Sequence, residues 1–159
     1  VRSAIYANQN MREGTLFGVQ GRLVCELGGG WLLDNTLTKT QGHYKTAAGR
    51  MPLDHIPPVY GRSSLAFQGK RFSSEAYLLF NSWKKLADYN LDGEDNLQYA
   101  TPDGMPSWMT VNLRFQVNVS KTIQVQGSLE NLTDRNYRVF ASGFSAPGRS
   151  WMIAVRSKF

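Results

Sequence analysis

The chain has 159 residues, of which 19% are charged and 12% are aromatic, and its single cysteine, Cys25, excludes an intrachain disulfide. Its apolar runs are far shorter than the roughly 20 residues of a membrane-spanning helix, but a spanning β-strand needs only about 9–11 residues of alternating character. The 18 Lys and Arg residues give a net charge of +6 but are scattered along the chain. Because a surface that follows a phosphate backbone needs clustered cations, we expect no nucleic-acid partner.

Apolar and polar residues alternate with a period of two along most of the chain, which predicts an all-β protein. The later segments are the clearest: Leu113 and Phe115 share one face of their segment, and Arg114 and Gln116 share the other. In chain order, the predicted antiparallel strands cover residues of about 15–27, 31–42, 58–68, 72–85, 108–119, 122–133 and 149–159.

The connections between these segments alternate strictly in length. Short ones lie at residues 28–30, 69–71 and 120–121, and long ones at 43–56, 88–107 and 135–149. A transmembrane β-barrel has this alternation because its periplasmic turns are short and its extracellular loops are long. A soluble β-sandwich also has alternating strands but no reason for alternating connections, and it stays as an alternative. We therefore expect the row with Leu113 to face lipid and the row with Arg114 to face an aqueous lumen.

Two further features concern the ends and edges of the predicted strands. With a periplasmic C-terminus, four aromatic residues on separate strands fall near one rim, as expected at a membrane interface: Trp31, Phe67, Phe72 and Phe159. Seven strands would leave two open edges in lipid, which a bilayer does not tolerate. We therefore expect the chain to be a fragment or a processed product, completed by strands N-terminal to Val1 or on another chain.

The C-terminal third carries a more specific pattern. Residues 130–134, 136–138, 141–143 and 146–149, with the terminal Phe159, resemble the closing segment of TonB-dependent outer-membrane receptors. Residues 52–58 with 61–62 resemble the entry to an earlier strand in that family. Residues 93–96 and 99–102, followed by Trp108 and residues 112–114, resemble receptors of Bacteroidetes-type bacteria. The resemblance runs from about Gly14 to Phe159.

This resemblance implies a 22-stranded barrel in the outer membrane of a Gram-negative bacterium, with the C-terminus in the periplasm. The whole chain, residues 1–159, would be the C-terminal part of the barrel domain, and an N-terminal plug would lie outside it. TonB, acting through the plug, would energise the import of a scarce nutrient: a siderophore, haem, cobalamin, glycan or peptide. The partners implied are the N-terminal barrel strands, the plug and membrane lipid. A porin or a barrel enzyme is the alternative within the membrane class, and a soluble β-sandwich binding module the alternative outside it.

The last strand also resembles the signal that the barrel-assembly machinery reads. That signal consists of a terminal aromatic residue preceded by apolar residues at alternating positions: Trp151, Ile153, Val155 and Phe159. The same residues would equally suit an aromatic anchor at the membrane interface, and both roles are compatible.

We do not expect an enzyme, because the two histidines, His43 and His55, belong to no residue set spaced like a catalytic triad. Polar residues on the predicted lumenal row could instead line a transport path: Tyr60, Arg62, Tyr77, Arg114 and Glu130. The alternative is that they hydrogen-bond to one another, to the plug and to trapped water.

One loop carries oxygen ligands at alternating positions. Asp88, Asn90, Asp92 and Glu94 fit the first positions of a D-x-N-x-D-G calcium loop. The twelfth position is Tyr99, whereas the pattern requires a bidentate Glu. The segment 88–99 therefore has two interpretations, a Ca²⁺ site or an acidic, turn-forming loop without an ion, and the missing Glu favours the second.

Overall fold

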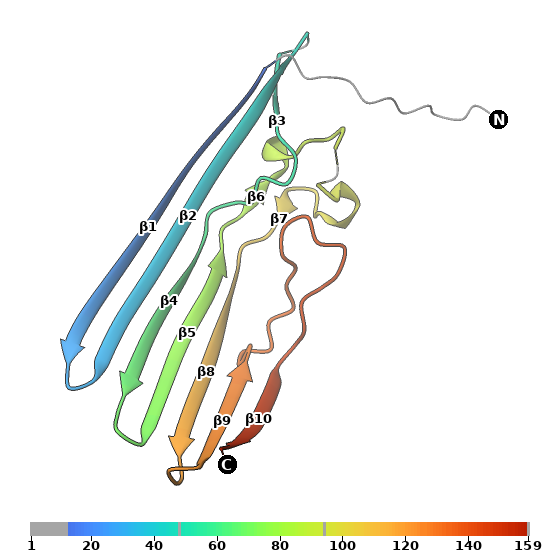
Figure 1. Cartoon of the computed structure of the whole chain (residues 1–159). Coiled ribbons are helices and arrows are strands. Elements are labelled where there is room, and N and C mark those ends of the chain that lie inside the picture. Colours follow the sequence, from blue (N-terminus) through green and yellow to red (C-terminus); the bar gives the residue numbers. More distant parts are fainter. Residues whose placement is uncertain (1–12, 48, 94, 159) are drawn as a thin grey trace.

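The computed structural model describes residues 13–47, 49–93 and 95–158. One antiparallel sheet dominates it, with the order β1-β2-β4-β5-β8-β9-β10, so that each strand lies beside its neighbour in sequence (Figure 1). The strands are β1 (Gly14–Gly28), β2 (Trp31–Thr46), β4 (Tyr60–Gln68), β5 (Phe72–Asn81), β8 (Trp108–Asn118), β9 (Ile123–Glu130) and β10 (Ser150–Ser157). The prediction of an all-β antiparallel sheet of about seven strands is confirmed.

The remaining elements belong to the long connections. β3 (Gly49–Pro52) extends the sheet beside β2, and β6 (Lys84–Lys85) pairs with β7 (Gly104–Met105). Two 3-10 turns, η1 (Leu86–Asp88) and η2 (Leu97–Tyr99), lie in the connection between β6 and β7. Among the described residues, none of the helices has the length and apolar character needed to cross a bilayer.

Three strand ends differ from the prediction by three residues or more. β5 stops at Asn81, and the predicted continuation to residue 85 forms the separate β6. β9 stops at Glu130 because Asn131 adopts a left-handed conformation with φ 51°, which Asn tolerates better than most residues. β2 runs on to Thr46, and β3 turns back to pair with its last residues, so part of the predicted loop 43–56 is strand.

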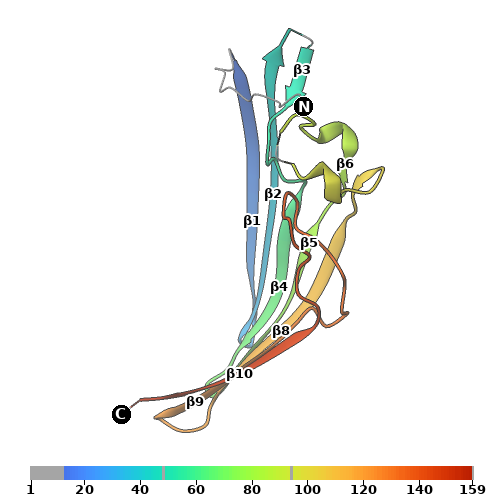
Figure 2. The same ribbon diagram turned by 90° about the vertical axis from the view of Figure 1, so that its right-hand side faces the viewer.

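The two faces of the sheet have reversed burial compared with a soluble protein. On the apolar face, Trp151 is 73% exposed and Val155 is 68% exposed. On the polar face, Tyr77 and Asn112 are only 3% and 2% exposed. In profile the sheet is a curved single layer with the long loops gathered at one end (Figure 2). Among the described residues no second sheet covers the apolar row, so the sandwich alternative is wrong.

Aromatic side chains organise the apolar face. At the end of the sheet that carries the short turns, the Trp31 and Phe67 ring centroids are 5.1 Å apart, and those of Phe67 and Phe72 are 6.4 Å apart. These three residues form the rim predicted from the sequence, and Phe159 lies outside the described residues. On the same face, a Cβ at Gly127 would collide with the Phe115 ring, which lies over the glycine of the neighbouring strand.

Candidate functional site on the polar face

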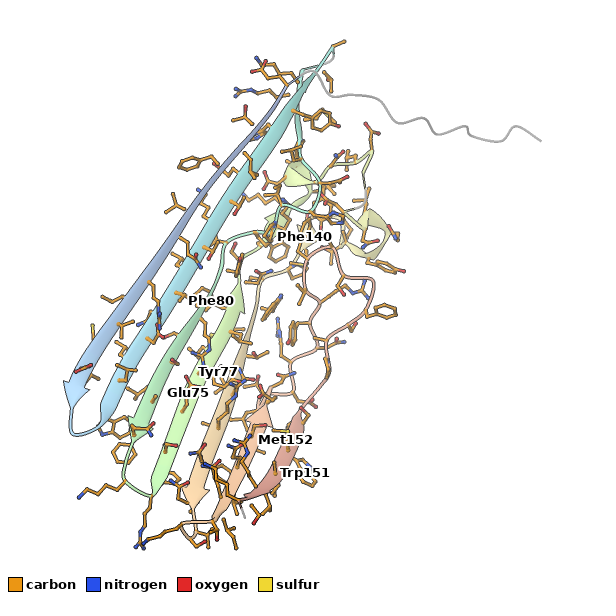
Figure 3. All side chains as sticks on the ribbon, in the orientation of Figure 1. Glu75, Tyr77, Phe80, Phe140, Trp151 and Met152 are labelled. Atoms are coloured by element: carbon orange, nitrogen blue, oxygen red, sulfur yellow. The ribbon has the colours of Figure 1, made fainter. Side chains whose placement is uncertain are left out.

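The polar face gathers five ionisable side chains at mid-height of β4, β5, β8 and β9. The strand register causes this, since Tyr77 pairs with Ser64 on one side and Asn112 on the other, while Glu75 pairs with Arg114. We call this set the Tyr77 cluster: Arg62, Glu75, Tyr77, Arg114 and Glu130. Figure 3 shows Glu75 and Tyr77 side by side in the middle of the sheet.

Tyr77 is the centre of the cluster. Its ring lies between two guanidinium groups, with the Arg62 Cζ at 4.5 Å and the Arg114 Cζ at 4.7 Å from the ring centroid. Its hydroxyl donates a hydrogen bond of 2.7 Å to Glu130 Oε2. The ring therefore holds two cations by cation–π attraction while its hydroxyl holds one carboxylate.

The charges of the cluster are matched in pairs. Arg62 Nη2 lies 2.7 Å from Glu75 Oε1, and Arg62 Nη1 donates to the Ser64 hydroxyl at 2.9 Å. Arg114 Nη2 lies 3.7 Å from Glu130 Oε1. Two cations and two carboxylates leave no net charge, which suits a structural network on a wetted wall better than a site that captures an ion. The Arg114 side chain is still 56% exposed, so its guanidinium is accessible to a partner on this face.

Asn112 connects the cluster to the C-terminal loop. Its side-chain amide nitrogen contacts the carbonyl of Tyr77 at 3.3 Å, and its Oδ1 accepts a hydrogen bond of 2.8 Å from the backbone N–H of Asn131. Asn131 in turn donates from Nδ2 to the Arg135 carbonyl at 2.9 Å. The segment that resembles a receptor closing motif therefore begins on the wall and is fixed there by two asparagine side chains.

Four of the five predicted lumenal candidates meet in this cluster, namely Arg62, Tyr77, Arg114 and Glu130. Tyr60 shares their face of β4 but is 42% exposed, and no contact with the cluster was found within the described part of the chain. Glu75 was not among the candidates. Its place on the polar face follows from the period of two, but its pairing with Arg62 depends on the register between β4 and β5.

A hollow of about 520 Å³ lies beside the cluster, toward the short turns, and is lined partly by Glu75, Arg114, Gln126 and Met152. Gln126 Nε2 donates to Gln116 Oε1 at 3.1 Å and to a second glutamine, Gln124, at 2.8 Å. The polar face thus continues as a layer of amides that satisfy one another and can bind water or a polar partner.

At the opposite end of the sheet, the long loops interlock into one body, which we call the loop unit (residues 53–59, 82–93, 95–107 and 131–149). Tyr89 and Phe140 pack edge to face with ring centroids 5.3 Å apart, and Met105 completes a small apolar cluster. Asn96 Nδ2 donates to the Ala141 carbonyl at 2.6 Å. Phe140 lies among these loops in Figure 3.

Lys84 lies inside the loop unit and is only 5% exposed. Its Nζ donates to the Ile56 carbonyl at 2.7 Å and lies 4.8 Å from the centroid of the Phe140 ring. Burial lowers the pKa of Lys84, and the nearby carboxylates Asp95 and Asp88 partly oppose this shift. One buried ammonium therefore joins all three segments of the unit.

The predicted calcium segment belongs to this unit, and a different residue organises it. Asp95 is 2% exposed and accepts hydrogen bonds from two backbone N–H groups, that of His55 at 2.7 Å and that of Asn90 at 2.9 Å. Asn90 Oδ1 accepts from the Asp92 N–H at 3.2 Å. Glu94 lies outside the described residues, and within those described no group of three or more His, Cys, Asp or Glu is placed to hold a metal. Calcium binding at Asp88, Asn90, Asp92 and Glu94 stays a prediction.

The predicted anchor residues of the last strand lie on the exposed apolar face of β10. Trp151, Ile153 and Val155 are 73%, 63% and 68% exposed, and Phe159 lies outside the described residues. β10 pairs only with β9 among the described strands, so its other edge is open. A strand that would complete a barrel could add at this edge.

No family model and no curated protein matches the sequence. The fold matches solved structures: the copper transporter OprC with a TM-score of 0.77 and 18% identity, over 92% of this chain and 24% of that one. A mutant of the ferric enterobactin receptor PfeA from Pseudomonas aeruginosa matches with a TM-score of 0.62 and 20% identity, over 89% and 22%. The FpvAI–pyocin S2 complex matches with a TM-score of 0.61 and 15% identity, over 92% and 19%.

The chain spans less than a quarter of the length of each of these structures. At such identities the likeness concerns the fold alone. The chain has the fold of one section of the barrel wall in these receptors and transporters, with the long loops included.

Proposed function

We propose that this chain is part of the wall of a TonB-dependent outer-membrane receptor that imports a scarce nutrient. The observation that carries the proposal is the reversed burial of the sheet, with exposed Trp151 and Val155 on one face and buried Tyr77 and Asn112 on the other. This distribution is stable only where the outer solvent is hydrocarbon and the inner one is polar. The names of two structural neighbours, a copper transporter and a ferric enterobactin receptor, support import.

In this proposal the polar face looks into the lumen, and the Tyr77 cluster holds the register of β4, β5, β8 and β9 against it. The plug, supplied by sequence outside this chain, would pack on that face and couple it to TonB. The loop unit would lie outside the cell, and the C-terminus in the periplasm, as the resemblance to receptors of Gram-negative, Bacteroidetes-type bacteria implies. The cargo would be a siderophore, haem, cobalamin, a glycan or a peptide.

The experiment uses the complete receptor that contains this chain. Membrane fractionation of a Gram-negative host should place it in the outer membrane, in a form whose gel mobility changes on boiling, as folded barrels behave. Uptake by cells that carry the receptor as the sole importer for a labelled nutrient should stop when TonB is deleted or the proton gradient is collapsed. Recovery as a soluble protein without detergent would overturn the membrane assignment, and uptake that continues without TonB would favour a porin.

A further inference from the structure

A groove of about 410 Å³ opens at the loop end of the sheet, between β2 and the segment that leads into β4. Four basic side chains line it: Lys39, His43 and Arg50 of β2 and β3, and the buried Lys84 of the loop unit. Trp83 also lines it and is 44% exposed, while its indole N–H donates to the Asp103 carbonyl at 3.1 Å. The groove therefore combines cations with an aromatic ring fixed by a hydrogen bond.

Lys39, His43 and Arg50 lie on the face of the sheet that carries the apolar row. Lys39 pairs with Val19 across β1 and β2, and it alternates along β2 with Thr38 and Thr40 of the polar face. Arg50 pairs with Lys45 across β2 and β3, which places both on that same apolar side. These charges thus belong to the surface that the proposed function assigns to lipid.

Their height on that surface decides what they meet. Lys39 lies eight residues after Trp31 of the aromatic rim, a distance of about 26 Å along the strand at roughly 3.3 Å per residue. A strand tilt of about 40° reduces this to roughly 20 Å of height, close to the upper border of an apolar band about 25 Å tall. A lysine at that border extends its ammonium toward the headgroups, where charge on the lipid face is tolerated.

Within residues 13–47, 49–93 and 95–158, Lys39 and Arg50 have no carboxylate counter-ion, unlike two other cations of the sheet. Lys45 pairs with Glu13 at 2.7 Å, and Arg62 with Glu75 at 2.7 Å. No carboxylate within ion-pair distance of Lys39 or Arg50 was found in the described part of the chain. Asp88 also lines the groove, but its negative charge is offset by the ammonium of Lys84, which lines the groove as well. The groove keeps an excess of positive charge that an anionic group could neutralise.

We propose that this groove binds the phosphorylated headgroup of a lipid in the outer leaflet, with acyl chains lying over Val19 beside Lys39 and over Leu37 below it. This inference rests on the proposed function, which supplies the membrane and its orientation. Lys39 and Arg50 would contact phosphate, and the Trp83 ring would sit at the level of the headgroups. The exposed apolar residues next to Lys39, Val19 beside it at 57% and Leu37 below it at 51%, argue for a lipid over a free anion.

The test uses the complete receptor, purified in a non-ionic detergent, and measures lipid binding by native mass spectrometry. The probes are diphosphoryl lipid A, the same lipid A after removal of both phosphates, and inorganic phosphate as competitor. The wild type should retain the diphosphoryl form preferentially, and millimolar phosphate should not displace it. Lys39→Gln and Arg50→Gln should each weaken binding about fivefold, and the double variant about 25-fold. Lys45→Gln is the matched control, because Lys45 lies on the same strand and face but is paired with Glu13, and it should change binding less than twofold.

Equal retention of the two lipid A forms would overturn the inference, as would equal losses for Lys39→Gln and Lys45→Gln. Displacement by phosphate would show a free-anion site and would overturn the lipid assignment. Each variant must first show the change in gel mobility on boiling that marks a folded barrel. A receptor that reaches the outer membrane but binds both lipid A forms equally refutes this inference alone. A receptor absent from the membrane refutes the proposed function.

Discussion

The wall of the sheet and the loop unit both bury polar groups, but their surroundings differ. In the wall, Tyr77 and Asn112 are covered by matched polar partners, and the apolar side chains point outward with no second layer of protein over them in the described part of the chain. The loop unit buries its apolar side chains as a soluble protein does, because Tyr89 and Phe140 form a small core and Lys84 is buried against it. Under the proposed function this difference has a physical cause, because hydrocarbon would surround the wall and water would surround the loops.

The largest effect should come from a charge placed on the apolar face. Leu113 lies on the apolar face of β8 and is 37% exposed, so Leu113→Arg puts a guanidinium on that face. Near mid-bilayer this should cost about 2–4 kcal/mol of folding free energy in lipid vesicles, measured by urea titration of the complete receptor. Gln116→Arg, three residues along on the polar face, is the control and should cost less than about 0.5 kcal/mol. Equal costs would mean that the two faces see the same solvent.

The next effect should stay within the loop unit. Phe140→Ala removes the ring that packs against Tyr89 and lies over the Lys84 ammonium. Loss of this ring should lower the free energy of local opening by about 3 kcal/mol. This is the low end of the range of costs for a buried Phe→Ala change, because the cluster is small. Amide hydrogen exchange should then rise in residues 84–105, while exchange in β8 and β9 stays unchanged. Faster exchange throughout the wall would show that the two regions do not fold independently.

A smaller effect is expected in the wall cluster. Tyr77→Phe keeps the ring between Arg62 and Arg114 but removes the hydroxyl that donates to Glu130. A hydrogen bond to a carboxylate contributes about 1.5 kcal/mol, and that loss should appear in the urea titration. Tyr60→Phe changes the same group on the same face outside the cluster and should have almost no effect. A Tyr77→Phe variant as stable as the wild type would show that the Tyr77 hydroxyl does not stabilise the wall.

The sequence predicts the wall far better than the loops. A period of two assigns Arg62, Tyr77 and Arg114 to one face, because successive residues of a strand point to opposite sides. It does not give the register between strands, so the pairing of Arg62 with Glu75 could not be foreseen. The loop unit depends on contacts between distant segments, such as the Asp95 carboxylate with the His55 N–H. No local pattern encodes such contacts. In this loop the calcium motif singles out Asp88 and Asp92, whereas the buried carboxylate of the loop is that of Asp95.

The smallest effect concerns pH and belongs to the loops alone. Because burial lowers the pKa of Lys84 below the 10.5 of a solvated lysine, the unfolded loop binds more protons than the folded one in the interval between the two values. The loop unit should therefore gain stability as pH rises through that interval, and it should carry the full cost of burying the charge at neutral pH. Tyr89, whose pKa burial raises, stays neutral over most of this range.

Hydrogen exchange of residues 84–105 between pH 7 and pH 10, corrected for the intrinsic rate, would measure this dependence. Lys84→Met keeps the length of the side chain without the charge, so its opening free energy should not change with pH. The wall residues supply an internal reference within the same sample, since the hydrogen bond of Lys84 to Ile56 and its contact with the Phe140 ring both lie within the loop unit. Loops that lose stability as pH rises would mean that the ammonium stabilises the unit through the Ile56 carbonyl and the Phe140 ring by more than its desolvation costs.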